Sequence, residues 1–111
     1  EKAARKEAIQ AATLYATEVP AQVMQLCYDS MEVAEAMAEF GNPNSVTDAA
    51  VGALAARAGV RGAFLNVRIN AAGLEDKERV AKFIAEGEKL CKLAEEREAK
   101  ILAIADTKIN K

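Results

Sequence analysis

Two long alanine-rich segments, separated by a short polar break, constrain the fold of this chain more than any other feature. The break runs from Gly41 to Asp48 and reads Gly-Asn-Pro-Asn-Ser-Val-Thr-Asp. Of the 111 residues, 51% are hydrophobic but only 5% are aromatic, and alanine is the most frequent of the apolar residues. Alanine is the strongest helix former and lets helices approach closely. The sequence therefore predicts an all-α bundle of long antiparallel helices, about four in this chain, within a larger helical domain.

Prolines and glycines mark where these helices should begin and end. A first helix is expected to end near Ala16, because the residue before Pro20 avoids helical dihedral angles. Further helices are expected over residues 20–40, 47–71 and 75–110, the last with a seam like that of a coiled coil. Met24, Met31 and Met37 are expected to fill the core. The predicted apolar faces are Val23, Leu26, Cys27, Ser30, Val33, Ala34 and Met37 in the second helix, Val51, Leu54, Ala58, Leu65 and Ile69 in the third, and Val80, Ile84, Gly87, Cys91, Ala94, Ile101 and Ala105 in the fourth.

The polar break can cap a helix and can also offer polar groups to a ligand. Gly41 and Pro43 stop one helix, and the pair Ser45 and Asp48 predicts a capping box at the start of the next. Its amides, hydroxyls and carboxylate then gather at a helix N-terminus, which carries partial positive charge. A capping turn without chemistry is the simpler interpretation, and both interpretations stay open at this point.

Small and polar residues share one face of the helix expected over residues 47–71. Interior glycine costs about 1 kcal/mol relative to alanine, so three glycines on one face indicate a close approach to this backbone. A neighbouring helix would explain the glycines. The carboxamides of Asn66 and Asn70 need hydrogen-bond partners or a ligand as well. At about 100° per residue, the strip comprises Asp48, Gly52, Ala55, Gly59, Gly62, Ala63, Asn66 and Asn70.

Composition excludes several classes of function. The net charge of −2 gives no basic footprint for nucleic acid or an anionic membrane, and no apolar run is long enough to span a bilayer. The chain has no histidine, which excludes imidazole catalysis and histidine metal ligands within it. Cys27 and Cys91 are too far apart in sequence to indicate a zinc site. We expect no metal, and two reduced thiols in a cytoplasmic protein.

Three motifs in this chain resemble those of one known family. They are Thr17-Glu18-Val19-Pro20, the stretch from Gly41 to Ala49, and the stretch from Ala63 to Asn70. In this order and spacing they resemble the formimidoyltetrahydrofolate cyclodeaminase / methenyltetrahydrofolate cyclohydrolase family, over nearly all of the chain from about residue 12. The resemblance implies an all-helical, self-associating domain. The family's Gly-rich N-terminal segment has no match here, so we expect residues 1–111 to form the C-terminal part of such a domain.

The resemblance also implies an enzyme that acts on one-carbon units carried by tetrahydrofolate. A cyclodeaminase closes the formimino group of 5-formiminotetrahydrofolate onto N10, which releases ammonia and 5,10-methenyltetrahydrofolate. A cyclohydrolase adds water to the methenyl carbon and gives 10-formyltetrahydrofolate. Both reactions need a proton donor or acceptor and stabilisation of a nearby positive charge. No cofactor is expected beside the folate substrate. A non-catalytic helical oligomerisation or scaffold domain remains the alternative.

Without histidine, a carboxylate is the expected acid or base. Asp48 is the first candidate, and Asp29 and Glu32 are weaker ones. The helix dipole favours the charged form of Asp48, whereas burial would oppose it. A homodimer or higher homo-oligomer is expected, and Arg68 is expected to serve a neighbouring subunit because it faces away from Asp48. The expected substrate-binding residues are Asn42, Asn44, Ser45, Asn66, Asn70 and Arg68.

Overall fold

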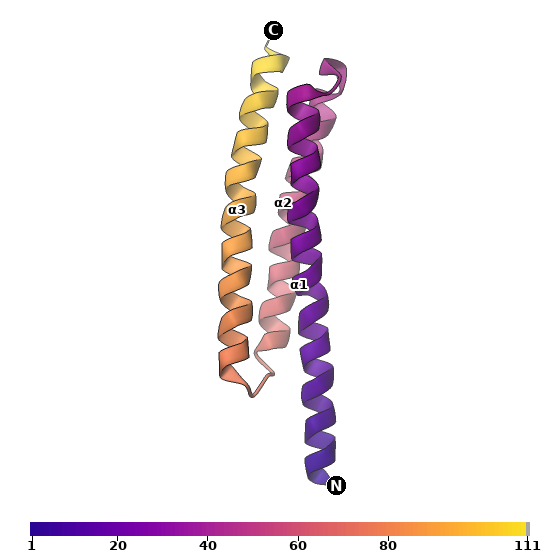
Figure 1. The fold of residues 1–111 in the computed structure, drawn as a ribbon, viewed down its shortest axis with the longest axis vertical. Helices are drawn as coiled ribbons and strands as arrows, with labels where there is room; N and C mark the ends of the chain where they lie inside the picture. The colour runs from indigo at the N-terminus through magenta and orange to yellow at the C-terminus, as the bar shows by residue number, and fades with distance from the viewer. Residues whose placement is uncertain (111) are drawn as a thin grey trace.

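The computed structural model describes residues 1–110 as three antiparallel helices. Helix α1 spans Lys2–Phe40, α2 spans Val46–Ala71 and α3 spans Lys77–Ile109, with a short 3-10 turn, η1, at Pro43–Ser45. Together they form a rod with extents of 68 × 18 × 16 Å, in which the N-terminal part of α1 runs past the α2–α3 turn (Figure 1). The predicted all-α class is confirmed. The number of helices is three rather than about four.

The predicted helix break before Pro20 is wrong, because α1 continues through this residue. Pro20 has no N–H to donate to the carbonyl oxygen of Ala16, four residues earlier. The side chain of Asn70 on α2 supplies the missing donor, since its Nδ2 lies 3.0 Å from that oxygen. A residue of the neighbouring helix thus compensates for the proline, and tertiary packing overrides the local signal.

The seam predicted for the last helix is confirmed, since the buried residues of α3 are Gly87, Cys91, Ala94, Ile101 and Ala105. Val80 and Ile84 are half-buried. On α1 the buried residues recur every seventh position. They are Thr17, Met24, Met31 and Ala38, and none is more than 1% exposed.

The apolar faces predicted for α1 and α2 are wrong for most of their members, although Cys27 and Ala34 of α1 do pack against the core. Val23, Leu26, Val33 and Met37 are 42% to 67% exposed, so Met37 does not fill the core as Met24 and Met31 do. Both helices are apolar on two sides, and periodicity alone does not select the side that faces the bundle. On α2 the exposed members are Val51, Leu54, Leu65 and Ile69, whereas the buried residues are Val46, Ala49, Ala50, Ala53, Val60, Ala63, Val67 and Ala71.

Gly87 allows α3 to pack closely against Phe64 of α2, because a Cβ at this position would lie 2.2 Å from Cε1 of the ring. We expect Gly87→Ala to lower the free energy of unfolding by about 1–3 kcal/mol, because the ring must move within a packed interface. The matched control is Gly52→Ala, where a Cβ meets nothing within 4 Å. It should raise stability by up to about 1 kcal/mol through helix propensity. Chemical denaturation measures both, and equal effects would contradict the packing argument.

Candidate functional site

A groove between α1 and α2 gathers residues of two sequence motifs. It has a volume of about 650 Å³. A Cβ at Gly62 would meet nothing within 4 Å, whereas a Cβ at Gly59 would lie 2.8 Å from Sγ of Cys27 on α1. An apolar groove with a few polar groups is typical of a small-molecule site. The residues lining this α1–α2 groove are Ala16, Val19, Pro20, Val23, Gly59, Gly62, Ala63, Asn66 and Asn70.

Two carboxamides lie on successive turns of α2 at this groove. Asn66 is exposed, whereas Asn70 is half-buried and donates from Nδ2 to the carbonyl oxygen of Ala16. Residues four apart share a helix face, so the structure brings these two predicted binding residues together. Asn66 offers both a donor and an acceptor to the groove.

The polar loop lies at the opposite end of α2, and its capping differs from the prediction. Asn42 is the residue that caps, because its Oδ1 accepts a hydrogen bond of 2.9 Å from the backbone N–H of Asn44. Ser45 makes no side-chain cap bond, so the predicted capping box is wrong. Ser45 closes η1 at φ −107° and ψ 10°, outside the extended conformation of an N-cap residue that bonds the first turn.

Asp48 lies in the first turn of α2 and is exposed. The helix dipole favours negative charge there, and within residues 1–110 its carboxylate forms no ion pair. The carboxylate is therefore free to meet a substrate.

One copy of the chain does not bring Asp48 close to the asparagine pair. Asp48 and Asn66 are eighteen residues apart on an unbroken helix, which corresponds to about 27 Å at 1.5 Å per residue. The strip of small residues predicted along α2 thus forms a groove with α1 only from Gly59 to Asn70. The predicted site residues fall into two groups, one at each end of α2.

Arg68 belongs to neither group. Its guanidinium lies over the ring of Phe64, 5.7 Å from the centroid, and it lines a separate groove with Val80 and Ile84 of α3. Of the weaker carboxylate candidates, Asp29 accepts a hydrogen bond of 2.8 Å from Gln25, and Glu32 is exposed.

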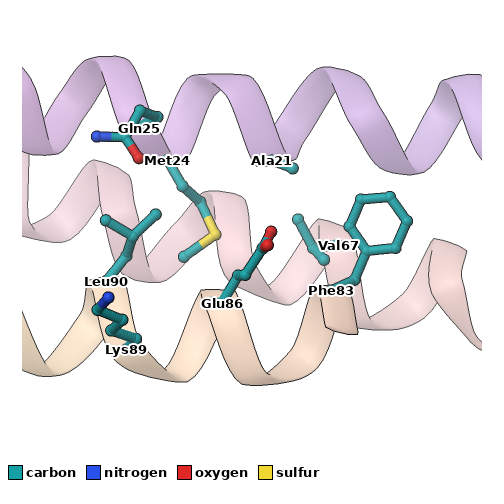
Figure 2. Close-up of a pocket in the computed structure, with 9 residues that line it drawn as sticks. Ala21, Met24, Gln25, Val67, Phe83, Glu86, Lys89 and Leu90 are labelled. Carbon is teal, nitrogen blue, oxygen red and sulfur yellow. The ribbon is translucent and has the colours of Figure 1, made fainter. Parts of the chain in front are cut away.

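A second cavity, of about 310 Å³, lies between α1 and α3 and contains none of the predicted site residues. Figure 2 shows Glu86 reaching from α3 toward α1 between Met24 and Val67. The pattern of charged residues on the last helix predicts a solvated face that includes Glu86, and this residue is exposed as well as lining the cavity. The neighbouring Gly87 is the sequence feature that could have predicted this place, because a glycine inside a helix indicates close packing at that point of α3.

The described residues also include two cysteines. Cys27 and Cys91 are both free thiols. Burial raises the pKa of the Cys91 thiol, which disfavours the nucleophilic thiolate. Within residues 1–110 no cluster of potential ligands for a metal ion occurs. No described helix is both long and apolar enough to cross a membrane.

Comparisons with known proteins agree with the resemblance of the three motifs. A sequence model of the formiminotransferase-cyclodeaminase family matches residues 1–89. The chain is also 40% identical over 110 residues to a methenyltetrahydrofolate cyclohydrolase of Methylorubrum extorquens, an alignment that covers 99% of this chain and 53% of that protein. The chain thus spans about half the length of this curated relative. Because the family model covers most of the chain and all three motifs, this protein belongs to the formiminotransferase-cyclodeaminase family.

Proposed function

We propose that the protein acts on reduced folates as a 5,10-methenyltetrahydrofolate cyclohydrolase. The 40% identity to a relative named for this reaction carries the proposal. The α1–α2 groove supports it, because apolar walls with two carboxamides suit a flat ring system with a polar edge, such as a pterin. Cyclodeaminase is the second candidate, since the family description names that activity. The methenyl compound is the substrate of one reaction and the product of the other, so both need similar site features.

In this proposal Asp48 provides the acid–base chemistry. Water adds to the methenyl carbon, a C–O bond forms, and the carboxylate accepts the proton that the water loses. The bond from that carbon to N5 then breaks as the new hydroxyl group loses its proton and becomes the formyl C=O, and N5 takes a proton to give 10-formyltetrahydrofolate. The negative charge of Asp48 also stabilises the cationic methenyl group. Around it, Asn42, Asn44 and Ser45 hydrogen-bond to the reacting end of the substrate, and Asn66 and Asn70 bind the pterin.

We also propose that the site is completed by a second copy of the chain. The separation of about 27 Å between Asp48 and Asn66 prevents one copy from placing both on a single reacting group. A two-fold antiparallel association along α2 would bring Asp48 of one copy toward Asn66 and Asn70 of the other. Large apolar side chains exposed along α1 and α2, such as Leu26 and Ile69, supply a surface for this contact. In such a dimer Arg68 would bind the glutamate tail of a folate held by its neighbour.

The test of this function uses the full-length protein and two substrates. With 5,10-methenyltetrahydrofolate, a cyclohydrolase lowers the near-UV absorbance of the methenyl group faster than buffer alone. With 5-formiminotetrahydrofolate, a cyclodeaminase releases ammonia and raises that absorbance. Hydrolysis without ammonia release supports the first candidate, and ammonia release supports the second. If the protein shows no turnover of either substrate and does not bind folate, the scaffold alternative is favoured.

A further inference from the structure

Pro20, Ala16 and Asn70 form a connected unit on the α1–α2 groove. We propose that Pro20 is a positioning residue, which frees the Ala16 carbonyl so that it holds the Asn70 carboxamide with Oδ1 ready to accept hydrogen bonds from a ligand. The inference rests on the proposed function for the identity of that ligand. The orientation of the side chain rests on the structure alone.

The chemistry of the hydrogen bond fixes which end of the carboxamide is engaged. A backbone carbonyl oxygen only accepts, so the group that contacts Ala16 at 3.0 Å must be the NH₂ of Asn70. A half-turn of the carboxamide would place Oδ1 against that oxygen and replace an attraction with a repulsion. With Nδ2 committed, Oδ1 is the atom left to accept from a ligand in the groove.

Burial does not explain why this bond is made. Ala16 is exposed, so water could satisfy its carbonyl oxygen in the absence of Asn70. Proline is also the least favourable residue in a helix interior. With any other residue at position 20, a backbone N–H would compete with Asn70 for this carbonyl oxygen, and the orientation of the carboxamide would be held less firmly. Pro20, a residue that disfavours helix formation, therefore stands where it orients the side chain of Asn70 in the groove.

The oriented acceptor selects for a ligand edge that carries N–H donors. Asn66, one turn away on the same face, adds a donor and an acceptor. Val19 and Val23 supply apolar wall on the α1 side. Adjacent N–H donors beside a carbonyl, on a flat ring, describe the aminopyrimidinone edge of a pterin. We assign that edge to Asn70 and Asn66.

Pro20→Ala in the full-length protein tests the inference. The new N–H would compete with Asn70 for the Ala16 oxygen and loosen the carboxamide, so KM for methenyltetrahydrofolate should rise by up to about fivefold, the loss of roughly one oriented hydrogen bond, with kcat nearly unchanged. Gln22→Ala, an exposed change on the same helix, should leave KM unchanged. If Pro20 acts through Asn70, Pro20→Ala should add little in an Asn70→Ala background.

Side-chain NMR provides a readout that does not need a folate. The Asn70 NH₂ protons should exchange slowly with solvent in the wild type and faster in Pro20→Ala. Unchanged exchange, an unchanged KM, or independent effects of the two substitutions would overturn the role of Pro20. Absence of folate turnover in the wild type, with slow exchange retained, would instead overturn the proposed function and its pterin assignment.

Discussion

Asp48→Ala is expected to lower the turnover of methenyltetrahydrofolate by about 10²–10⁴-fold, the range contributed by a positioned general acid or base. The carboxylate is exposed and forms no ion pair within residues 1–110, so its removal should disturb the fold little. The loss of a first-turn acid should cost at most about 1 kcal/mol of helix stability. The decrease in methenyl absorbance measures the rate, and far-UV circular dichroism measures the helix content.

Asp29→Ala provides the matched control, because it removes an exposed carboxylate from mid-helix in α1. Its only side-chain hydrogen bond within the described chain is with Gln25, and turnover should stay near that of the wild type. Near-normal turnover in Asp48→Ala, with the helix content retained, would exclude Asp48 as the catalytic acid or base. Loss of turnover in Asp29→Ala alone would move the assignment to Asp29.

A mixture of two variants, each impaired in a different half of the site, is expected to recover activity. If each site combines Asp48 of one copy with Asn66 of the other, a dimer of Asp48→Ala and Asn66→Ala subunits contains one intact site. Random pairing of equal amounts in a two-fold dimer then restores about one quarter of wild-type turnover. The variants are unfolded and refolded together, and the rate is compared with that of each variant refolded alone.

The control for this experiment pairs variants from the same end of α2. Asn66→Ala mixed with Asn70→Ala should recover nothing, because both substitutions fall on the same side of every composite site. If mixing Asp48→Ala with Asn66→Ala also recovers nothing, although both variants fold and associate, the two-copy site is wrong. Another part of the full-length protein would then complete the groove.

The sequence predicts α3 better than the other two helices, for a physical reason. On α3 the apolar residues occupy one seam and charged residues occupy the rest, so a single side can be buried. On α1 and α2 apolar residues lie on two sides, and a periodicity argument favoured the side with the larger residues. The bundle buries Met24 and Met31 of α1, together with small residues of α2, and leaves Leu26 and Ile69 exposed.

Two predictions from local sequence were wrong, because contacts with another helix or with an adjacent turn determine the backbone conformation at those positions. The break expected at Pro20 is avoided by a hydrogen bond from a residue fifty positions later in the chain. The capping box expected at Ser45 is lost because Pro43 begins a 3-10 turn that changes the backbone of Ser45. Neither effect can be derived from the spacing of the motif alone.

The candidate site was predictable where it depends on helix periodicity. Asn66 and Asn70 were expected on one face and do lie together at the α1–α2 groove. Placing residues at about 100° per step around the helix also put Asp48 on this face. That procedure gives the direction of each residue around the helix axis but not its distance along the axis. The place of Glu86 at the second cavity was not predicted, because a charged residue on an exposed helix usually needs no explanation beyond solubility.

The hydrogen bond from Asn70 to Ala16 has a consequence for how α1 and α2 align during folding. Alanine-rich helices with apolar residues on two sides can pack in several registers of similar energy. A slide of one helical turn would keep many of those contacts, but it would separate Asn70 from the one carbonyl in α1 that Pro20 leaves without a helical partner. A single polar pair of this kind can specify register among nearly equivalent apolar packings. Pro20 and Asn70 thus select one register of α1 against α2, which the apolar contacts alone would leave open.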